Sequence, residues 1–591
     1  MKQTMTELTW KVGGAQGEGI DSTGEIFAMA LNRRGHYVFA YRHFMSLIKG
    51  GHTNYKVRVT PRKTGYHGDG LDILIAFDQR TVDENGWELN EGAALIYDSS
   101  RIRSLKAPEG KNIRLCPVPV TEMAKEVGSP IMKNMIACGV SAGLVGLSPD
   151  AFDSLIEDRF GKKGEQVVAK NKEAVQKGYD YALAHFGQLK ELPDPEPEED
   201  GGGHLYLSGN EAVALGALAA GCRFLAAYPI TPATEIMYAA LAHFPRFGGK
   251  VIQAEDEIAA CIMAIGANYA GVRAMTSTSG PGISLMQEAI GLSGITETPL
   301  VVVDVMRGGP GTGLPTKTEQ SDLNELLHGS HGEIPRIVLT PTTVEECFRY
   351  TAEAFNLAEK YQCPVIVATD MFLGMSKQSV PVKAIDFSSV RIDRGELISD
   401  EELAQLAPGA YRRYTVTESG ISKRSIPGQK NGRFVALSNE HDDGAIEEIE
   451  DPRTRVEQMS KRLRKLKGFD ADAIGYSYDG PETTEWTLVG FGSTAAQIRE
   501  AVEVLRSKGI RTGHLQLRVL NPFPDASVKR VLEGAERILV VENNATGQLA
   551  ERIRARVGFH DKIVSCLKFS GDPFTVKEIL GHVHQEEGVT A

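Results

Sequence analysis

Three consecutive acidic residues, Glu255, Asp256 and Glu257, precede an otherwise apolar stretch, IAACIMAIGANYAG. The spacing of its apolar residues predicts a helix, and acidic side chains in a first helical turn are favoured by the helix dipole. Capping therefore explains one or two of the three acids. It does not explain Glu257, which lies four residues before Cys261 on the predicted buried face. A buried carboxylate needs a partner or a proton, so Glu257 is a candidate functional acid.

The stretch LAAYPITPAT, residues 225–234, reads as a buried strand followed by two prolines that flank Ile230 and Thr231. Proline fixes φ and removes a hydrogen-bond donor, so Pro229 and Pro232 end the strand and hold Thr231 in one local geometry. Such rigidity suits a binding site. An ordinary strand-to-helix turn is the alternative.

The stretch VVVDVM predicts a strand that ends at Arg307 and continues into the glycine-rich loop GGPGTGLPTKTEQ, which contains Thr316. An arginine at the carboxyl end of a parallel strand is suited to bidentate binding of a carboxylate. A surface salt bridge is the alternative for Arg307. Upstream, TSTSGPGISLMQEAI predicts a strand, a Gly-Pro-Gly corner and a helix.

Two glycine-rich stretches occur near the N-terminus. VGGAQGEGI, residues 12–20, follows a predicted strand and opens a helix, so its glycines could bring backbone amides close to a phosphate. Its spacing is not GxGxxG, and a tight βα turn explains it equally well. The sequence GDG at residues 68–70 resembles the magnesium and diphosphate motif of thiamine enzymes, but the asparagine expected about 25 residues later is missing. We therefore predict a hairpin turn there.

Short apolar strands alternate with helical patterns along most of the chain, which predicts an α/β protein. The segment LPDPEPEEDGGG lacks apolar periodicity and predicts a linker. The part after it predicts a doubly wound parallel sheet, whose ligands bind at the carboxyl ends of the strands. The predicted division is 1–191 as an α/β domain, 192–203 as a linker, 204–375 as the doubly wound domain, 376–484 as an irregular connecting segment with one charged helix, and 485–591 as a third α/β domain.

Composition excludes several classes of protein. The 591 residues carry a net charge of −12 with 42% hydrophobic residues, which favours a globular protein and disfavours a nucleic-acid binder. The N-terminus lacks an apolar signal region, and no long uncharged run predicts a membrane span, so we expect a cytoplasmic protein. The seven cysteines are scattered without metal-ligand spacing, so no metal site or iron–sulfur cluster is expected in this chain.

Four motifs together carry a resemblance: YPITP, QAEDEIAA, STSGPGISLM and MRGGPGTGLPTKTEQSD, in this order. They resemble the alpha subunit of 2-oxoacid:ferredoxin oxidoreductases. The N-terminal GGAQGEGI and HFMSLIKGGHTNYKVRV resemble the gamma domain of that family, here fused ahead of the alpha part. NEHDDG and LNPFP extend the resemblance over nearly the whole chain, and it implies a transketolase C-terminal-like fold for the last domain.

The resemblance implies a division of labour between two chains. The doubly wound domain binds the pyrimidine end of thiamine diphosphate. A beta partner subunit holds Mg²⁺, the diphosphate and a [4Fe–4S] cluster, which agrees with the missing diphosphate motif and cluster cysteines here. Ferredoxin accepts the electrons, coenzyme A is a co-substrate, and the assembly is expected to be a heterotetramer, a dimer of alpha-beta heterodimers.

Residue roles follow from the same resemblance. Glu257 is similar to the glutamate that hydrogen-bonds the pyrimidine N1′, favouring the imino tautomer that removes the thiazolium C2 proton. Thr231, Arg307 and Thr316 match positions that contact the substrate, and the RGGPGTGLPT form goes with 2-oxoglutarate-type or broad-specificity enzymes. Further cofactor contacts are expected from Tyr228 and Pro229 beside the pyrimidine, and from Gly14, Gly17 and Gly19 to coenzyme A.

The expected activity is the conversion of 2-oxoglutarate and coenzyme A to succinyl-CoA and CO₂ with reduction of ferredoxin, or the reverse carboxylation of a reductive TCA cycle. Pyruvate, a branched-chain oxoacid or an aryl pyruvate is the alternative substrate. A non-catalytic scaffold that binds a nucleotide through its glycine turns is the alternative from another class.

Overall fold

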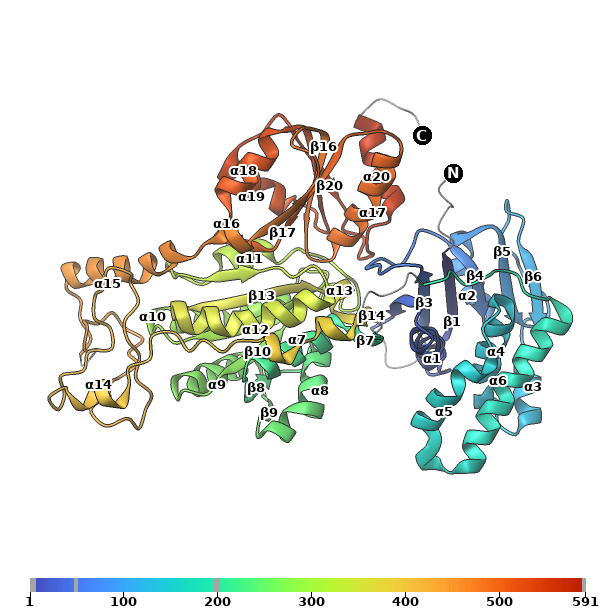
Figure 1. The fold of residues 1–591 in the computed structure, drawn as a ribbon, viewed down its shortest axis with the longest axis horizontal. Helices are drawn as coiled ribbons and strands as arrows, with labels where there is room; N and C mark the ends of the chain where they lie inside the picture. The colour runs from blue at the N-terminus through green and yellow to red at the C-terminus, as the bar shows by residue number, and fades with distance from the viewer. Residues whose placement is uncertain (1–6, 47–50, 196–201, 446, 587–591) are drawn as a thin grey trace. The chain divides into compact units, whose positions relative to one another are not determined.

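The computed structural model describes residues 7–46, 51–195, 202–445 and 447–586 of the chain. The chain forms two compact units, one of Met1–Ser208 with Met375–Ala384 and one of Gly209–Gly374 with Ile385–Ala591. Figure 1 shows helices and strands alternating in both units, which confirms the predicted α/β class. Of the predicted linker at 192–203, residues 196–201 lie outside the described residues.

The first unit contains, within its described residues, an eight-stranded sheet in the order β6-β5-β4-β1-β3-β2-β14-β7. Its strands are β1 (Leu8–Ala15), β2 (Tyr37–Phe44), β3 (His52–Thr60), β4 (Leu71–Ala76), β5 (Leu89–Asp98), β6 (Arg114–Val118), β7 (His204–Ser208) and β14 (Lys377–Pro381). Its helices are α1 (Ile20–Arg33), α2 (Gln79–Asn85), α3 (Val120–Val127), α4 (Lys133–Val145), α5 (Asp153–Phe160) and α6 (Glu165–His185).

This sheet is mixed, because β1 pairs in parallel with β4 but antiparallel with β3. The predicted hairpin at Gly68–Gly70 is therefore wrong. Those glycines lie in the loop from β3 to β4, and β1 lies between these two strands in the sheet. A glycine pair indicates that the chain turns, but strand pairing is decided by contacts with β1, which are distant in sequence.

The second unit contains a seven-stranded sheet among its described residues, in the order β18-β12-β13-β11-β10-β8-β9. Only the edge pair β12 with β18 is antiparallel; the other pairs are parallel. Its strands are β8 (Phe224–Ala227), β9 (Lys250–Gln253), β10 (Ala274–Thr278), β11 (Leu300–Met306), β12 (Ile337–Leu339), β13 (Pro364–Asp370) and β18 (Val519–Asn521). Its helices are α7 (Gly209–Ala219), α8 (Thr234–His243), α9 (Glu257–Tyr269), α10 (Gly280–Ile295), α11 (Leu323–His328), α12 (Val344–Tyr361) and α13 (Met371–Met375).

The C-terminal part of this unit forms a five-stranded sheet, in the described residues, with the order β15-β17-β16-β19-β20. Its strands are β15 (Tyr476–Asp479), β16 (Thr484–Phe491), β17 (Thr512–Leu517), β19 (Ala535–Glu542) and β20 (Ile563–Leu567), and its helices are α17 (Thr494–Ser507), α18 (Asp525–Glu533), α19 (Gln548–Val557) and α20 (Val576–Glu586). One continuous apolar core joins this sheet to the parallel sheet, for example through Val302, Ile366 and Phe491. The segment predicted to be irregular carries β14, α14 (Asp400–Ala404), α15 (Pro452–Arg464) and α16 (Ala471–Ile474).

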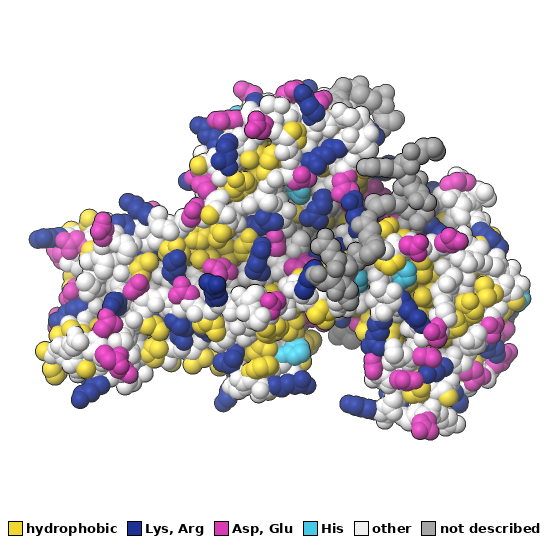
Figure 2. Space-filling view, in the orientation of Figure 1, with side chains coloured by type: hydrophobic (Ala, Val, Ile, Leu, Met, Phe, Trp, Pro, Cys, Tyr) yellow, Lys and Arg dark blue, Asp and Glu magenta, His cyan; other side chains and the backbone are white. Residues whose placement is uncertain are grey.

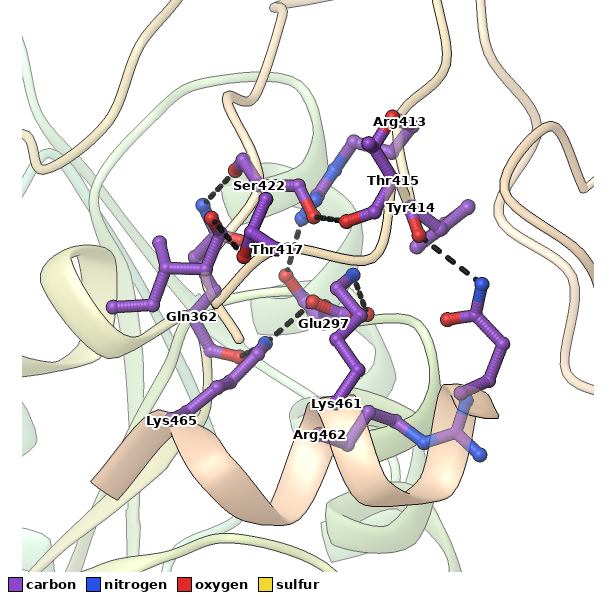
Figure 3. Close-up of polar contacts among 12 residues, drawn as sticks. Glu297, Gln362, Arg413, Tyr414, Thr415, Thr417, Ser422, Lys461, Arg462 and Lys465 are labelled. Carbon is purple, nitrogen blue, oxygen red and sulfur yellow. Dashed lines mark hydrogen bonds and ion pairs between the residues drawn. The ribbon is translucent and has the colours of Figure 1, made fainter. Parts of the chain in front are cut away.

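A buried ionic cluster attaches the connecting segment to the parallel-sheet domain (Figure 3). Glu297, in the turn between α10 and β11, lies 2.6 Å from both Lys461 and Lys465, and these three side chains have no exposed area. Arg413 donates to the backbone carbonyl of Glu297 at 2.8 Å. Burial raises the pKa of Glu297, but Lys465, Lys461 and Arg413 together hold that pKa well below its ordinary value. Glu297 therefore supplies a counter-charge to both buried lysines.

We expect Glu297→Gln to destabilise the second unit by about 3–5 kcal/mol, because it leaves buried cations without their counter-charge. The measurement is thermal unfolding of the purified chain, with limited proteolysis of the connecting segment. The matched control is Glu457→Gln, which breaks the exposed pair with Arg453 on α15 and is expected to cost no more than about 1 kcal/mol. Equal effects of the two substitutions would contradict a structural role for the cluster.

Charged side chains of both signs are intermixed over the face drawn in Figure 2. The face in view therefore carries no extended patch of one sign of charge. Across the described residues, no helix combines the length and apolarity needed to cross a membrane.

Candidate functional site

The YPITP turn follows β8 and leads into α8. Its backbone is held on two sides: Arg307 donates to the Thr231 carbonyl at 2.6 Å, and Asn210 donates to the Pro232 carbonyl at 2.9 Å. Thr231 and Pro229 are half-buried, whereas Tyr228 is 40% exposed. The rigidity predicted from the prolines is therefore reinforced by hydrogen bonds from two distant elements.

Glu257 is the first residue of α9, and its environment differs from that of its neighbour Asp256. Asp256 caps the helix by accepting from the Ala259 amide at 2.8 Å. Glu257 is only 5% exposed, which confirms the prediction that it lies on the buried face. Among the described residues, its carboxylate has no hydrogen-bond or ion-pair partner. Capping thus explains Asp256 but not the burial of Glu257.

The Gly-Pro-Gly corner at the start of α10 makes room for this acid. A Cβ atom added at Gly282 would lie 2.7 Å from Glu257 Cγ and 2.0 Å from Thr278 Oγ1. Any larger residue would therefore displace the Glu257 side chain. Glu257 points to the N-terminal turn of α10, where backbone amides favour negative charge.

Arg307 lies at the carboxyl end of β11 and is 6% exposed, so it is not a surface salt bridge. Besides Thr231, it donates to the Thr312 carbonyl at 3.3 Å, while its buried Nε has no partner among the described residues. Burial lowers the pKa of Arg307, and the charges of Asp322 and Glu257 oppose that shift. Arg307 thus joins the YPITP turn to the glycine-rich loop and lies in the electrostatic field of Glu257.

The glycine-rich loop folds back on itself beside Arg307. The Gly308 amide donates to the Lys317 carbonyl at 3.1 Å, which brings Thr316 next to the end of β11; Thr316 is 7% exposed. The C-terminal part fixes this loop, because Lys317 pairs with Asp572 at 2.6 Å and the Thr318 backbone amide donates to the Gly571 carbonyl at 3.0 Å. Thr231, Glu257, Arg307 and Thr316 therefore lie around one end of the parallel sheet, as the strand-end argument predicts.

Two further acids lie at this end of the sheet that the sequence reasoning missed. Asp304 is completely buried inside β11, and Asp322 immediately precedes α11. A single acid in an otherwise apolar parallel strand was the available signal for Asp304. For Asp322, which stands in an ordinary polar loop sequence, no comparable signal exists.

The glycine turn of the first unit has the predicted strand-turn-helix form between β1 and α1. Gly17 and Gly19 have φ of 91° and 82°, which explains glycine at these two positions. Gly14 lies in β1, where a Cβ atom would come within 2.9 Å of the Ile20 side chain. Lys133 lies 3.0 Å from Glu18, so a cation stands near the start of α1. A contact of these glycines with coenzyme A stays a prediction.

All seven cysteines are buried and unpaired in the structure. Burial raises the pKa of Cys261 to about 12, so this thiol stays protonated beside Glu257. In the part of the chain that the structure describes, no group of three or more His, Cys, Asp or Glu side chains has the arrangement of a metal site.

Three families of known domains match the chain in succession. They are described as "Pyruvate ferredoxin/flavodoxin oxidoreductase" over residues 9–181, "Pyruvate flavodoxin/ferredoxin oxidoreductase, thiamine diP-bdg" over residues 215–461, and "Pyruvate:ferredoxin oxidoreductase core domain II" over residues 484–579. The second match contains every candidate residue around the parallel sheet. This order of domains defines an oxidoreductase subunit with a thiamine diphosphate-binding domain.

Similar proteins agree with this class. The 2-oxoacid:ferredoxin oxidoreductase subunit alpha of Sulfolobus sp is 32% identical over 97% of this chain and 96% of its own length. The 2-oxoglutarate synthase subunit KorA of Methanothermobacter thermautotrophicus is 35% identical over 64% of this chain and 97% of its own length. The structure of 2-oxoglutarate:ferredoxin oxidoreductase from Magnetococcus marinus, with 2-oxoglutarate, coenzyme A and succinyl-CoA bound, is 36% identical with a TM-score of 0.91, covering 99% of this chain and 100% of that one.

The chain belongs to the 2-oxoacid:ferredoxin oxidoreductase family, as an alpha subunit that carries a gamma-like domain at its N-terminal end. The resemblance read from the four sequence motifs is thereby confirmed.

Proposed function

We propose that the chain is the alpha subunit of a 2-oxoglutarate:ferredoxin oxidoreductase that acylates coenzyme A. The reaction converts 2-oxoglutarate, coenzyme A and two oxidised ferredoxins to succinyl-CoA, CO₂, two reduced ferredoxins and one proton, or runs in reverse. The observation that carries this proposal is Glu257, an acid 5% exposed and without a partner among the described residues, beside the α10 corner. A heterocyclic nitrogen that shares a proton fits this acid.

The site suits the pyrimidine end of thiamine diphosphate. Glu257 would hold a proton between its carboxylate and the pyrimidine N1′, with Tyr228 and Pro229 beside the ring. When bound, thiamine diphosphate supplies the carbon nucleophile and the electron sink for decarboxylation. The beta partner would hold the diphosphate, Mg²⁺ and a [4Fe–4S] cluster, in a heterotetramer of two alpha-beta pairs that passes electrons to ferredoxin.

The remaining residues would bind and orient the oxoacid. Arg307 would bind a substrate carboxylate through its guanidinium, and Thr231 and Thr316 would donate hydrogen bonds to the 2-oxo acid end. Gly14, Gly17 and Gly19 would contact coenzyme A. We propose the same domain division as the sequence predicts, with boundaries at 191, 203, 375 and 484.

The preference for 2-oxoglutarate is supported by the Magnetococcus marinus enzyme, whose structure contains that substrate, and by the KorA relative. The Sulfolobus relative, described only as acting on a 2-oxoacid, favours a broader substrate range as the second candidate.

The test is oxoacid-dependent viologen reduction by the chain co-purified with its native partner, with and without coenzyme A. We expect kcat/KM for 2-oxoglutarate to exceed that for pyruvate by about tenfold or more, since one additional charge-assisted hydrogen bond contributes about 1.5–3 kcal/mol. A branched-chain oxoacid and phenylpyruvate complete the comparison. A higher kcat/KM for pyruvate would overturn the choice of substrate, and no oxoacid-dependent reduction at all would favour a scaffold subunit.

A further inference from the structure

Among the described residues, buried polar atoms without partners occur on β10, on β11 and at Asp322, just before α11. Both carboxylate oxygens of Asp304, Oδ2 of Asp322 and the hydroxyl of Thr276 are buried and have no hydrogen-bond partner among the described residues. Asp304 is paired in register with Thr278, so its side chain lies on the same face of the sheet as Thr276. Buried polar groups are almost always satisfied, so this cluster indicates a place where a proton, a water or a ligand completes the bonding.

The α10 corner brings Asp322 to the same helical turn as Glu257. A Cβ atom added at Gly280 would lie 2.7 Å from both carboxylate oxygens of Asp322, just as one at Gly282 would lie 3.0 Å from Oε1 of Glu257. The two glycines of this corner therefore each make room for one carboxylate. Asp322 occupies the N-cap position of α11, but its side chain accepts no capping hydrogen bond from that helix.

Burial and two neighbouring acids favour protonation of Asp322 near neutral pH. Burial raises the pKa of Asp322 to about 7, with Glu325 on α11 and Glu319 in the loop adding to the shift and Arg307 opposing it. Burial, together with Asp322 and Glu325, raises the pKa of Asp304 well above its ordinary value. The positive charge of Arg307 therefore acts on the pKa of Asp322, whereas it is not among the causes of the shift at Asp304.

We propose that Asp322 takes up one proton from solvent when the 2-oxoacid binds, so that substrate and proton enter the site together. This inference rests on the proposed function, in which the substrate carboxylate binds Arg307. Once Arg307 pairs with that carboxylate, it stabilises the charge on Asp322 less, and the new anion repels the Asp322 carboxylate. Both effects raise the pKa of Asp322, while Glu257 stays committed to the cofactor. Asp322 is a positioning residue that acts through Arg307.

The experiment is isothermal titration calorimetry of N-oxalylglycine into the complex co-purified with its partner. This probe has the two carboxylates of 2-oxoglutarate, but its amide makes the 2-carbonyl a poor electrophile, so no turnover intervenes. Titrations at pH 8 in buffers of low and high ionisation enthalpy give the number of protons bound. We expect uptake of about 0.5–0.9 proton per site, because a group with a pKa near 7 is mostly ionised at pH 8.

Two substitutions test whether Asp322 itself takes up the proton. Asp322→Asn is expected to abolish the uptake and to remove the rise of Kd with pH above 7. Glu325→Gln, which removes a neighbouring negative charge, is expected to keep the uptake but to shift the pH dependence of Kd to lower pH. A merely structural role for Asp322 would change the affinity without changing the proton count.

The outcomes separate this inference from the proposed function. Binding of the probe to the wild-type complex without proton uptake overturns the inference alone, as does uptake that persists in Asp322→Asn. If the wild-type complex does not bind the dicarboxylate, the proposed function fails and the inference fails with it. Uptake in the wild type that is lost in Asp322→Asn and shifted in Glu325→Gln supports the inference.

Discussion

Glu257→Gln is expected to lower kcat of the reconstituted complex by about 10²-fold or more, the range typical of losing a positioned acid–base group. Glutamine has the size and shape of glutamate, so it should fit beside Gly282, where a Cβ atom would be 2.7 Å from Glu257 Cγ. Its amide does not share a proton with a ring nitrogen as a carboxyl group does. The measurement is steady-state viologen reduction with saturating thiamine diphosphate and coenzyme A.

The matched control is Asp256→Asn, on the adjacent acid. Asp256 caps α9 through the Ala259 amide, and the Oδ1 of an asparagine accepts the same hydrogen bond, so Asp256→Asn should cost little stability and leave kcat nearly unchanged. Near-normal turnover in Glu257→Gln would remove this residue from catalysis and favour the scaffold alternative. Equal loss of activity in both variants would indicate damage to the helix instead.

Arg307→Lys is expected to lower kcat/KM for 2-oxoglutarate by about 10- to 100-fold, mainly through KM. An ammonium group does not reproduce the planar guanidinium that donates to the Thr231 and Thr312 carbonyls at 2.6 and 3.3 Å. The substitution therefore weakens carboxylate binding and loosens the YPITP turn and the glycine-rich loop together. The measurement is the full dependence of rate on oxoacid concentration.

Arg336→Lys is the matched control for this substitution. Arg336 is 4% exposed and also donates to two backbone carbonyls, those of Leu326 and Gly329. It reports the general effect of replacing a buried arginine by lysine within the same domain. Kinetics of Arg307→Lys that match those of Arg336→Lys would exclude a specific role for Arg307 in substrate binding.

Local sequence patterns were sufficient to predict the elements that carry the site. The apolar run before Arg307 is β11, and the periodicity after Glu257 is α9. These predictions succeed because strand and helix periods, proline and glycine act within a few residues. The burial of Glu257 was predictable for the same reason, since its face of the helix is set by its spacing from Cys261.

Long-range contacts were not predictable in the same way. The hydrogen bond from Arg307 to the Thr231 carbonyl joins residues 76 positions apart. Arg307 therefore also holds the backbone of the YPITP turn in place. Asp322 reaches the α10 corner only because Gly280 leaves space for it. Strand β14 pairs with β2, more than 300 residues earlier in the chain, which no local pattern indicates. Such features depend on tertiary contacts between distant segments, and local sequence patterns do not specify these contacts.

The central claim is that Glu257 faces the pyrimidine of thiamine diphosphate while another polypeptide holds the diphosphate. The most direct measurement is a cryo-EM map of the complex assembled with its native partner and thiamine diphosphate. We expect the Glu257 carboxylate within about 3 Å of the pyrimidine N1′, and the diphosphate and Mg²⁺ bound by the partner chain. A map in which the Glu257 side chain points into solvent, or in which the pyrimidine binds elsewhere, would contradict the account.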